Sequence, residues 1–320
     1  MRLIKPDLKK QMIPPEKDQE HQVQSVQSVV YSNVTRHMQN AKECKIHLAE
    51  SAGCCFGVKR AIKMALEAVA SDDGPLYMLG DIVHNEHVVG HITEAGIRVV
   101  DSLKQVDSGT LLIRAHGAVP EQYTVAGRKG LKVLDATCPL VLDIHTIARQ
   151  LQQDGYTIIV IGDHGHDEVV GIAGQVHTNL VISTPEEAGE LQKISRIGVV
   201  VQSTQNIDDV QRIIGVLAGK CRELRFVNTI CPATTARQRD IRRLPREHDV
   251  VIIIGSHTSA NTCRLTEISK AVNPRTYQVE SAGDVRAAWF KGAASVGVSA
   301  GASTPEDVIQ SVLAAIEGMP

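Results

Sequence analysis

The sequence predicts an α/β protein of three similar lobes, each built on a mainly parallel sheet and related by pseudo-threefold symmetry. Short β-branched runs alternate with stretches of helical period, which is typical of βα units. Three strand-to-helix junctions share one plan and divide the folded part of the chain into thirds. With 320 residues, of which 43% are hydrophobic, the chain can bury enough apolar surface for two or three compact units.

The first element is a polar lead, residues 1–45, which contains Pro6, Pro14 and Pro15 and has no sustained apolar period. A segment of this composition buries too little apolar surface to fold alone, so we expect a disordered extension. The three lobes are expected to follow at 46–137, 138–230 and 231–320.

Nearly continuous apolar runs are expected to be strands that are covered on both faces. They span 75–80, 110–115, 156–162, 196–202, 249–255 and 294–299. Helices are expected between them. Residues 139–155 and 304–318, for example, place their apolar side chains on one face of a helix.

Each of the three junctions carries a cysteine, namely Cys55, Cys138 or Cys231. The junction sequences are IHLAESAGCC before GVKRAIKMALEAV, KVLDATC before PLVLDIHTIARQL, and RFVNTIC before PATTARQRDIRRL. In parallel α/β sheets ligands gather beyond the carboxyl ends of the strands, and a helix N-terminus at that place favours a thiolate. The three cysteines are therefore expected to face one central axis.

Two interpretations of these cysteines stay open at this point. Structural zinc normally takes four ligands, often in CxxC pairs that this sequence lacks, whereas a four-iron cluster held by three cysteines leaves one iron open for substrate. The cluster is the sharper hypothesis, and three ordinary buried cysteines are the alternative. The remaining cysteines Cys44, Cys221 and Cys263 lie at no such junction and are expected to be ordinary packing residues.

Polar side chains follow the expected strands at places where a buried core does not require them. They are His84, His116, His166, Glu168, Ser203, Thr204, Ser259, Asn261 and Ser303. Histidine, hydroxyl and amide donors on several loops, with only 3% aromatic residues, suit an anionic phosphate better than a stacked base. Plainer explanations stay open, because a strand-end histidine is often structural. Glu168 is either a solvated helix-start carboxylate or a proton donor.

The bulk properties exclude several classes of function. A net charge of -2 and a pI near 6.7 do not match the basic surface of a nucleic-acid binder. No apolar run has the roughly 18 residues of a membrane span, and no strand-linked GxGxxG motif indicates a nicotinamide site; bound flavin is not expected either. Because the N-terminus lacks a basic and then apolar leader, we expect a reducing, cytoplasmic location with free cysteines.

Taken together, the motifs carry a specific resemblance. They are AGCCFGVKRAI (52–62), VHN (83–85), AHG (115–117), DATCPLV (135–141), GHDEV (165–169), QSTQN (202–206), NTICPATTARQ (228–238), GSHTSANTCRL (255–265) and SAGASTP (299–305). In this order they closely resemble the 4-hydroxy-3-methylbut-2-enyl diphosphate reductase family, from about Ile46 to Ile316. The polar lead lies outside the resemblance.

The resemblance implies a trefoil of three α/β lobes around one [4Fe-4S] cluster, with Cys55, Cys138 and Cys231 as ligands and one iron left open. It implies the reductive dehydration of a hydroxyallylic diphosphate to isopentenyl and dimethylallyl diphosphate, with an electron donor such as ferredoxin or flavodoxin. Glu168 would be the proton source, assisted by Ser203 and His166. The diphosphate would be held by His84, His116, His166, Ser203, Thr204, Ser259, Asn261 and Ser303. A monomer or a weak homodimer is expected.

Four residues depart from the family's usual pattern. Cys54 stands where Phe is usual and is expected to be a packing residue, and Ser203 stands where Thr is commoner and keeps the hydroxyl. Asp167 replaces a common Pro beside Glu168, and Ala260 removes a hydroxyl that some relatives offer to the phosphate. Two alternative functions stay open, a cluster-dependent hydro-lyase and a redox-sensing phosphate-ligand binder.

Overall fold

The computed structural model describes residues 44–71 and 74–319. Of the expected N-terminal extension, 1–45, residues 1–43 lie outside this part of the chain. No helix in the described ranges is long and apolar enough to cross a membrane.

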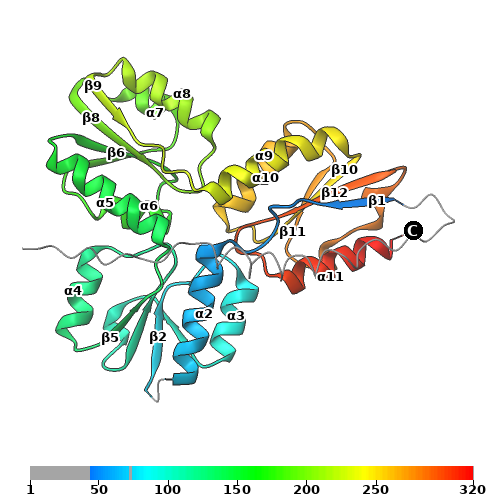
Figure 1. The fold of residues 1–320 in the computed structure, drawn as a ribbon, viewed down its shortest axis with the longest axis horizontal. Coiled ribbons are helices and arrows are strands. Elements are labelled where there is room, and N and C mark those ends of the chain that lie inside the picture. The colour runs from blue at the N-terminus through cyan, green and yellow to red at the C-terminus, as the bar shows by residue number, and fades with distance from the viewer. Residues whose placement is uncertain (1–43, 72–73, 320) are drawn as a thin grey trace, which may run out of the picture. The chain divides into compact units, whose positions relative to one another are not determined.

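The described residues form three sheets of four parallel strands, and all three sheets have the same strand order. The first sheet runs β3 (Arg98–Val100), β2 (Leu76–Leu79), β4 (Thr110–Ile113), β5 (Lys132–Asp135). The second runs β7 (Asn179–Ile182), β6 (Thr157–Ile161), β8 (Ile194–Val201), β9 (Cys221–Phe226). The third runs β11 (Thr276–Val279), β10 (Val250–Ile254), β12 (Ser295–Ala300), β1 (Lys45–Leu48). Figure 1 shows the three lobes around a common centre, which confirms the expected fold class.

Helices cover both faces of every sheet. On one face lie α2 (Phe56–Ser71) and α3 (Glu86–Glu94), α5 (Pro139–Gln153) and α6 (Asp167–Ala173), and α9 (Pro232–Glu247) and α10 (Ala260–Lys270). On the other face lie α4 (Pro120–Arg128), α7 (Pro185–Glu190) with α8 (Ile207–Ala218), and α11 (Glu306–Glu317). Short 3-10 turns are found at Leu103–Gln105, Ala282–Asp284 and Ala287–Phe290. Because both faces are covered, the central strands are almost wholly apolar, as in β10 with five buried residues.

The first strand lies in the sheet of the third lobe. β1 pairs with β12, although residues 46–48 fall in the range expected for the first lobe. The reason is topological, because β1 takes the edge position that β5 and β9 take in the other sheets. The lobe ranges 46–137, 138–230 and 231–320 remain a proposal, with β1 added to the third sheet.

Each cysteine junction carries the chain from the edge strand of one sheet to the first helix of the next lobe. The backbone N–H of each cysteine donates to a loop that follows the third strand of a sheet. Cys55 donates to Ala302 O (3.0 Å), Cys138 to Ala115 O (2.9 Å) and Cys231 to Ser203 O (3.0 Å). The same bond in three places fixes the three cysteines at equivalent points around the centre.

Candidate active site

One central cavity collects every side chain that the sequence singled out. Its lining includes Cys55, Cys138, Cys231, His84, His116, His166, Glu168, Ser203, Thr204, Ser259, Asn261 and Ser303. These residues come from all three lobes and from the carboxyl ends of nine strands. The structure thus brings all of them together, and their individual roles stay predictions.

The three cysteines occupy the starts of α2, α5 and α9. Cys138 and Cys231 directly precede a proline at the first helical position, which needs no N–H partner there. A Cβ on Gly57 would lie 2.6 Å from Cys138 Sγ, so only glycine allows this sulfur to approach the first turn of α2. Burial raises the pKa of the Cys138 thiol, and the thiols of Cys55 and Cys231 raise it further. The three sulfurs therefore share one electrostatic environment.

The three sulfurs are not placed as the ligands of a single metal ion. In the described ranges, only His84, His116 and Asp167 bring three potential ligand atoms within 4.8 Å of one another. Two sulfurs on one zinc ion, with bonds of about 2.3 Å, would be at most about 4.6 Å apart. The three cysteine sulfurs do not meet this limit as a group, so one zinc ion could not bind all three as they are placed.

A buried arginine places positive charge beside the thiols. Arg237 lies on α9 and is 3% exposed, and its guanidinium donates to the carbonyl oxygens of Gly53 and Ala233. Its Nε makes no hydrogen bond to any residue that the structure describes. Burial lowers the Arg237 pKa, and the thiols of Cys55 and Cys231 oppose that shift. A buried cation needs a nearby anion, and a thiolate-bound metal core would provide one.

The neighbouring Cys54 is a packing residue, as its sequence position suggests. Its sulfur donates to Thr304 O at 3.2 Å and packs against the core of the first lobe. Burial and the adjacent Cys55 raise the pKa of the Cys54 thiol to about 11. Cys54 is therefore held as a neutral thiol, and it does not line the cavity.

Three equivalent loops supply the polar part of the cavity. Each begins at the glycine that ends a strand, Gly80, Gly162 or Gly255, and the fourth residue further on is His84, His166 or Ser259. The glycines donate their N–H groups to the ends of β3, β7 and β11 in the same way. The repeat therefore places two imidazoles and one hydroxyl at corresponding points of the cavity.

Glu168 and Ser203 form a buried pair. Glu168 is 2% exposed, and its two carboxylate oxygens accept hydrogen bonds from the Ser203 N–H (2.5 Å) and the Ser203 hydroxyl (2.9 Å). Burial raises the Glu168 pKa, although both bonds from Ser203 oppose the shift. A carboxyl group of this kind retains a proton nearer to neutral pH, as a general acid requires.

His166 has a defined tautomer. It caps α6, and its Nδ1 accepts the Glu168 N–H at 3.1 Å. The proton of the neutral ring is therefore on Nε2. Burial, and next the neighbouring His84, lower the His166 pKa to about 4, so the ring is neutral at pH 7.

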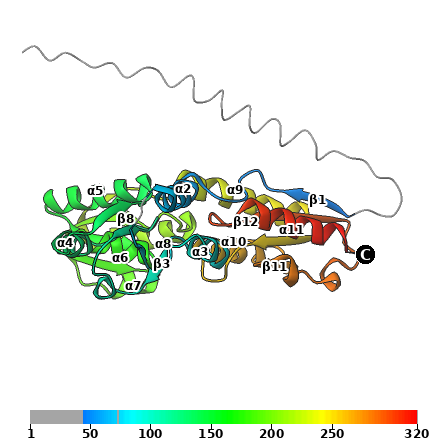
Figure 2. The same ribbon diagram turned by 90° about the horizontal axis from the view of Figure 1, so that it is seen from below.

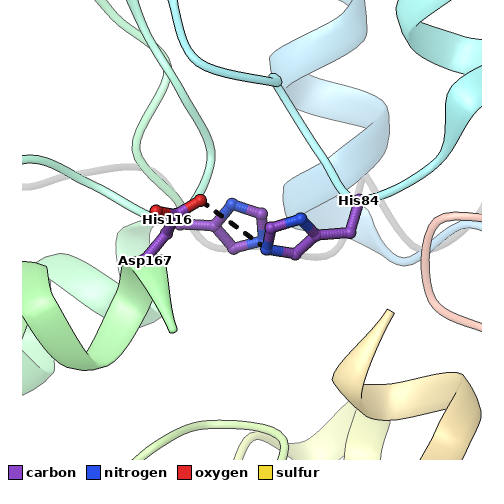
Figure 3. Close-up of side chains that lie close together, drawn as sticks. All are labelled: His84, His116 and Asp167. Carbon is purple, nitrogen blue, oxygen red and sulfur yellow. Dashed lines mark ion pairs between the residues drawn. The ribbon is translucent and has the colours of Figure 1, made fainter. Parts of the chain in front are cut away.

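His84 and His116 stack beside an ion pair. Their ring centroids are 4.4 Å apart, and Asp167 approaches His84 Nε2 at 3.7 Å (Figure 3). Arg114 already holds the same Asp167 oxygen at 2.5 Å, so a cation at this place would displace the guanidinium. Burial lowers the pKa of both imidazoles, and Asp167 opposes the shift only at His84. We conclude that this group is better suited to an anion than to a metal ion.

Several buried polar atoms of the cavity lack a hydrogen-bond partner among the described residues. His84 Nε2, His116 Nδ1 and Asn261 Nδ2 make no hydrogen bond within the described residues. The hydroxyls of Thr204, Ser259 and Ser303 already bond to Gln202, Thr262 N and His84 O. Since buried polar groups are rarely left unpaired, a ligand rich in oxygen atoms is expected there.

Sequence reasoning missed the polar contacts that join the lobes around the cavity. Arg114 pairs with Asp167, Arg264 with Asp163, and Glu86 accepts hydrogen bonds from Ser256 and Thr258. The available signal was position, because Arg114, Asp163 and Ser256 all lie within two residues of the end of an expected strand. Their partners come from other lobes, which a single repeat does not reveal.

The three lobes surround one central cavity, which holds three free thiols, a buried acid, and imidazole and amide atoms that have no partner among the described residues. This arrangement is that of a metal-dependent enzyme for an anionic substrate. The model of the family described as LytB protein matches residues 46–317. The chain therefore belongs to the LytB family.

Curated relatives and solved structures agree with this assignment. A 4-hydroxy-3-methylbut-2-enyl diphosphate reductase of Aquifex aeolicus is 41% identical over 276 residues, covering 85% of this chain and 96% of the relative. The enzyme of the same name from Geobacter metallireducens is 43% identical over 270 residues, covering 84% of this chain and 95% of that relative.

Two solved structures cover a similar part of the chain. One is an (E)-4-hydroxy-3-methyl-but-2-enyl diphosphate reductase, described as the terminal enzyme of the non-mevalonate pathway. It is 41% identical, has a TM-score of 0.65, and the match covers 86% of this chain and 99% of that one. The E-1-hydroxy-2-methyl-but-2-enyl-4-diphosphate reductase of Plasmodium falciparum is 28% identical with a TM-score of 0.82, over 85% of this chain and 87% of that one.

Proposed function

We propose that the chain is an iron-sulfur oxidoreductase that converts (E)-4-hydroxy-3-methylbut-2-enyl diphosphate to isopentenyl or dimethylallyl diphosphate, the last step of the methylerythritol phosphate route. Two electrons and two protons are taken up, the C4–O bond breaks, and water leaves. The observation that carries the proposal is one cavity that combines three free cysteines with the Glu168–Ser203 pair and unpartnered donors.

Cys55, Cys138 and Cys231 are the proposed ligands of one [4Fe-4S] cluster with an open iron site. Such a cluster, when bound, supplies electrons and a Lewis-acidic iron to the reaction. The presence of all three thiols in one cavity and the buried charge of Arg237 support this choice. A ferredoxin or a flavodoxin is the proposed electron donor. The protein itself is proposed to be a monomer or a weak homodimer.

The polar loops are proposed to hold the diphosphate. His84 Nε2, His116 Nδ1 and Asn261 Nδ2 would gain the hydrogen-bond partners that they lack, and His166 would donate from Nε2. The hydroxyls of Thr204, Ser259 and Ser303 line the same cavity and complete the set. Fixing the anion in this way orients the carbon chain toward the thiols and lowers the entropic cost of reaction.

Glu168 is the proposed proton source. Its carboxyl proton would pass through Ser203 Oγ, at 2.9 Å, to the departing C4 oxygen, which leaves as water. The second proton is taken up from solvent and goes to the allylic carbon. Burial supports this role, because it raises the pKa of Glu168 and keeps water away from the pair.

An oxygen-free preparation tests the proposal. Iron and acid-labile sulfide are first measured per chain, and the oxidation of reduced methyl viologen is then followed with and without the hydroxyallylic diphosphate. We expect the dye to be consumed only when this substrate is present. Product formation without any reductant would indicate a hydro-lyase instead, and tight binding without turnover would indicate a sensor.

A further inference from the structure

Arg237 is a buried cation that pairs with no carboxylate among the described residues. Of the lysines and arginines that the structure describes, it alone is buried. The side chains of Arg114 and Arg264 are 18% and 13% exposed, and each pairs with a carboxylate of the second lobe. Asp240, one turn beyond Arg237 on α9, is instead held by the N–H and hydroxyl of Ser51, at 3.2 and 2.6 Å. Because a buried charge without a counter-charge is strongly destabilising, Arg237 needs another anion.

The guanidinium of Arg237 is held between two of the cysteine junctions. It donates to Gly53 O, two residues before Cys55, and to Ala233 O, two residues after Cys231. After burial, which lowers the Arg237 pKa, the thiols of Cys55 and Cys231 have the largest effects, and both raise this pKa. Figure 2 shows α2 and α9, which these cysteines precede, on the same side of the described part of the chain. Two proposed cluster ligands are therefore the groups whose negative charge can compensate the arginine.

The threefold repeat does not require a charge at this position. Arg237 is the sixth residue after its cysteine, and the sixth residues after Cys55 and Cys138 are Ala61 and Ile144. Both of these side chains are apolar and buried, at 0% and 2% exposure. Two lobes thus satisfy the packing at this point with an apolar residue, whereas the third lobe buries an arginine there. A residue that departs from the local packing rule in this way indicates a functional role.

We propose that Arg237 stabilises the reduced state of the proposed [4Fe-4S] centre and so raises its reduction potential. The inference rests on the reductase function proposed above. An oxidised [4Fe-4S]²⁺ core with three thiolates carries one net negative charge, and an electron from the donor makes two, with no bond formed or broken. A fixed positive charge in a poorly solvated place favours the more negative state. Arg237 does not line the cavity, so it acts through the centre and not on the substrate.

Two variants separate the charge of Arg237 from its hydrogen bonds. Arg237→Lys keeps the charge and Arg237→Gln removes it, while both side chains still carry a hydrogen-bond donor. In oxygen-free preparations, iron and acid-labile sulfide are measured per chain, and the reduction potential is measured by dithionite titration followed by electron paramagnetic resonance. We expect Arg237→Lys to keep a potential close to that of wild type. In Arg237→Gln the equilibrium constant for one-electron reduction should fall by about tenfold, which corresponds to about 59 mV.

The matched control is Arg239→Gln, which removes the same charge two residues further along α9, from a side chain that is 75% exposed. We expect this variant to keep the wild-type potential, because water screens an exposed charge. Equal potentials in Arg237→Lys and Arg237→Gln would overturn the proposal, and so would an equal shift in Arg239→Gln.

The iron content decides the case in which a variant cannot be titrated. Loss of iron in Arg237→Gln alone would support the proposal, because the oxidised centre is also negatively charged and would need the same cation. Loss of iron in both Arg237 variants would overturn it, since the guanidinium would then serve by its hydrogen bonds and not by its charge. If wild type itself holds no iron and sulfide, the proposed reductase function fails, whatever the role of Arg237.

Discussion

Glu86 and Glu168 occupy equivalent positions in two lobes and have opposite environments. Each is the sixth residue after the glycine that ends a strand, Gly80 or Gly162. Glu168 is buried against Ser203, and burial raises its pKa. Glu86 is exposed, and its pKa is lowered. Desolvation alone would raise this pKa, but hydrogen bonds from its own backbone N–H and from the hydroxyls of Ser256 and Thr258 in the third lobe outweigh that effect.

The difference separates what the threefold repeat determines from what the local environment of each side chain determines. The repeat fixes the position of a side chain, whereas the neighbour that covers it fixes its protonation. In the third lobe the same position holds Asn261, which cannot titrate. The threefold repeat therefore places one buried acid in the cavity. Of the other two equivalent residues, Asn261 lines the cavity and Glu86 accepts hydrogen bonds from the third lobe.

The cysteines are the part of the frame that is alike in all lobes, so their replacement is expected to have the largest effect. Cys55→Ser, Cys138→Ser and Cys231→Ser should each reduce iron per chain to a small fraction of the wild-type value, because each removes one proposed ligand. Cys54→Ser is the control and should keep wild-type iron, since its sulfur bonds to Thr304 O. Full iron content in any of the first three variants would remove that cysteine from the ligand set.

The two glutamates are compared directly by Glu168→Gln and Glu86→Gln. We expect Glu168→Gln to lower turnover by about 10²- to 10⁴-fold, the usual contribution of a general acid, and Glu86→Gln to change it little. Binding of inorganic diphosphate, measured by calorimetry, should be retained in both. The Tm of Glu168→Gln should not fall below wild type, because the raised pKa means that the ionised carboxylate is unfavourable in the folded state. Equal losses of turnover would contradict the assignment.

Asp167 adds negative charge to the second loop, beside the proposed diphosphate site. Asp167→Asn removes this charge and leaves Arg114 free to attract an anion. A unit charge at about 7 Å and an intermediate dielectric is worth roughly 1 kcal/mol, so the Kd for inorganic diphosphate should fall by about five- to tenfold. Asp307→Asn is the control, because its carboxylate pairs with exposed His87 and does not line the cavity. Weaker binding by Asp167→Asn would mean that Asp167 positions the histidines and does not repel the ligand.

The sequence predicted the centre of each sheet better than its edges. The six apolar runs are the two middle strands of each sheet, where cover on both faces demands apolar residues. The outer strands β3, β7 and β11 are short and carry no such pattern. Likewise, the cavity residues follow from strand ends and from the resemblance, whereas Arg237 and Arg114 depend on contacts between lobes. Such contacts depend on the packing of segments that lie far apart in the chain.

His84 and His166 are the last equivalent pair, and they predict a modest effect of pH on stability. Burial lowers the His166 pKa from 6.5 to about 4 although Asp163 and Asp167 oppose the shift, and burial lowers the His84 pKa, where Asp167 again opposes the shift. Between these pH values the unfolded chain binds more protons at His166 than the folded chain. The stabilisation is thus present above pH 6.5 and is lost as pH falls toward 4. At pH 5 the loss is about 1–2 kcal/mol, or a few degrees in Tm.

His166→Asn keeps a capping side chain at α6 but cannot titrate, so the difference in Tm between pH 7 and pH 5 should shrink. The control, His87→Asn, changes an exposed histidine and should leave that difference unchanged. If His166→Asn also leaves it unchanged, then His166 is not buried in its neutral form and the environments of the two loops differ less than the structure indicates.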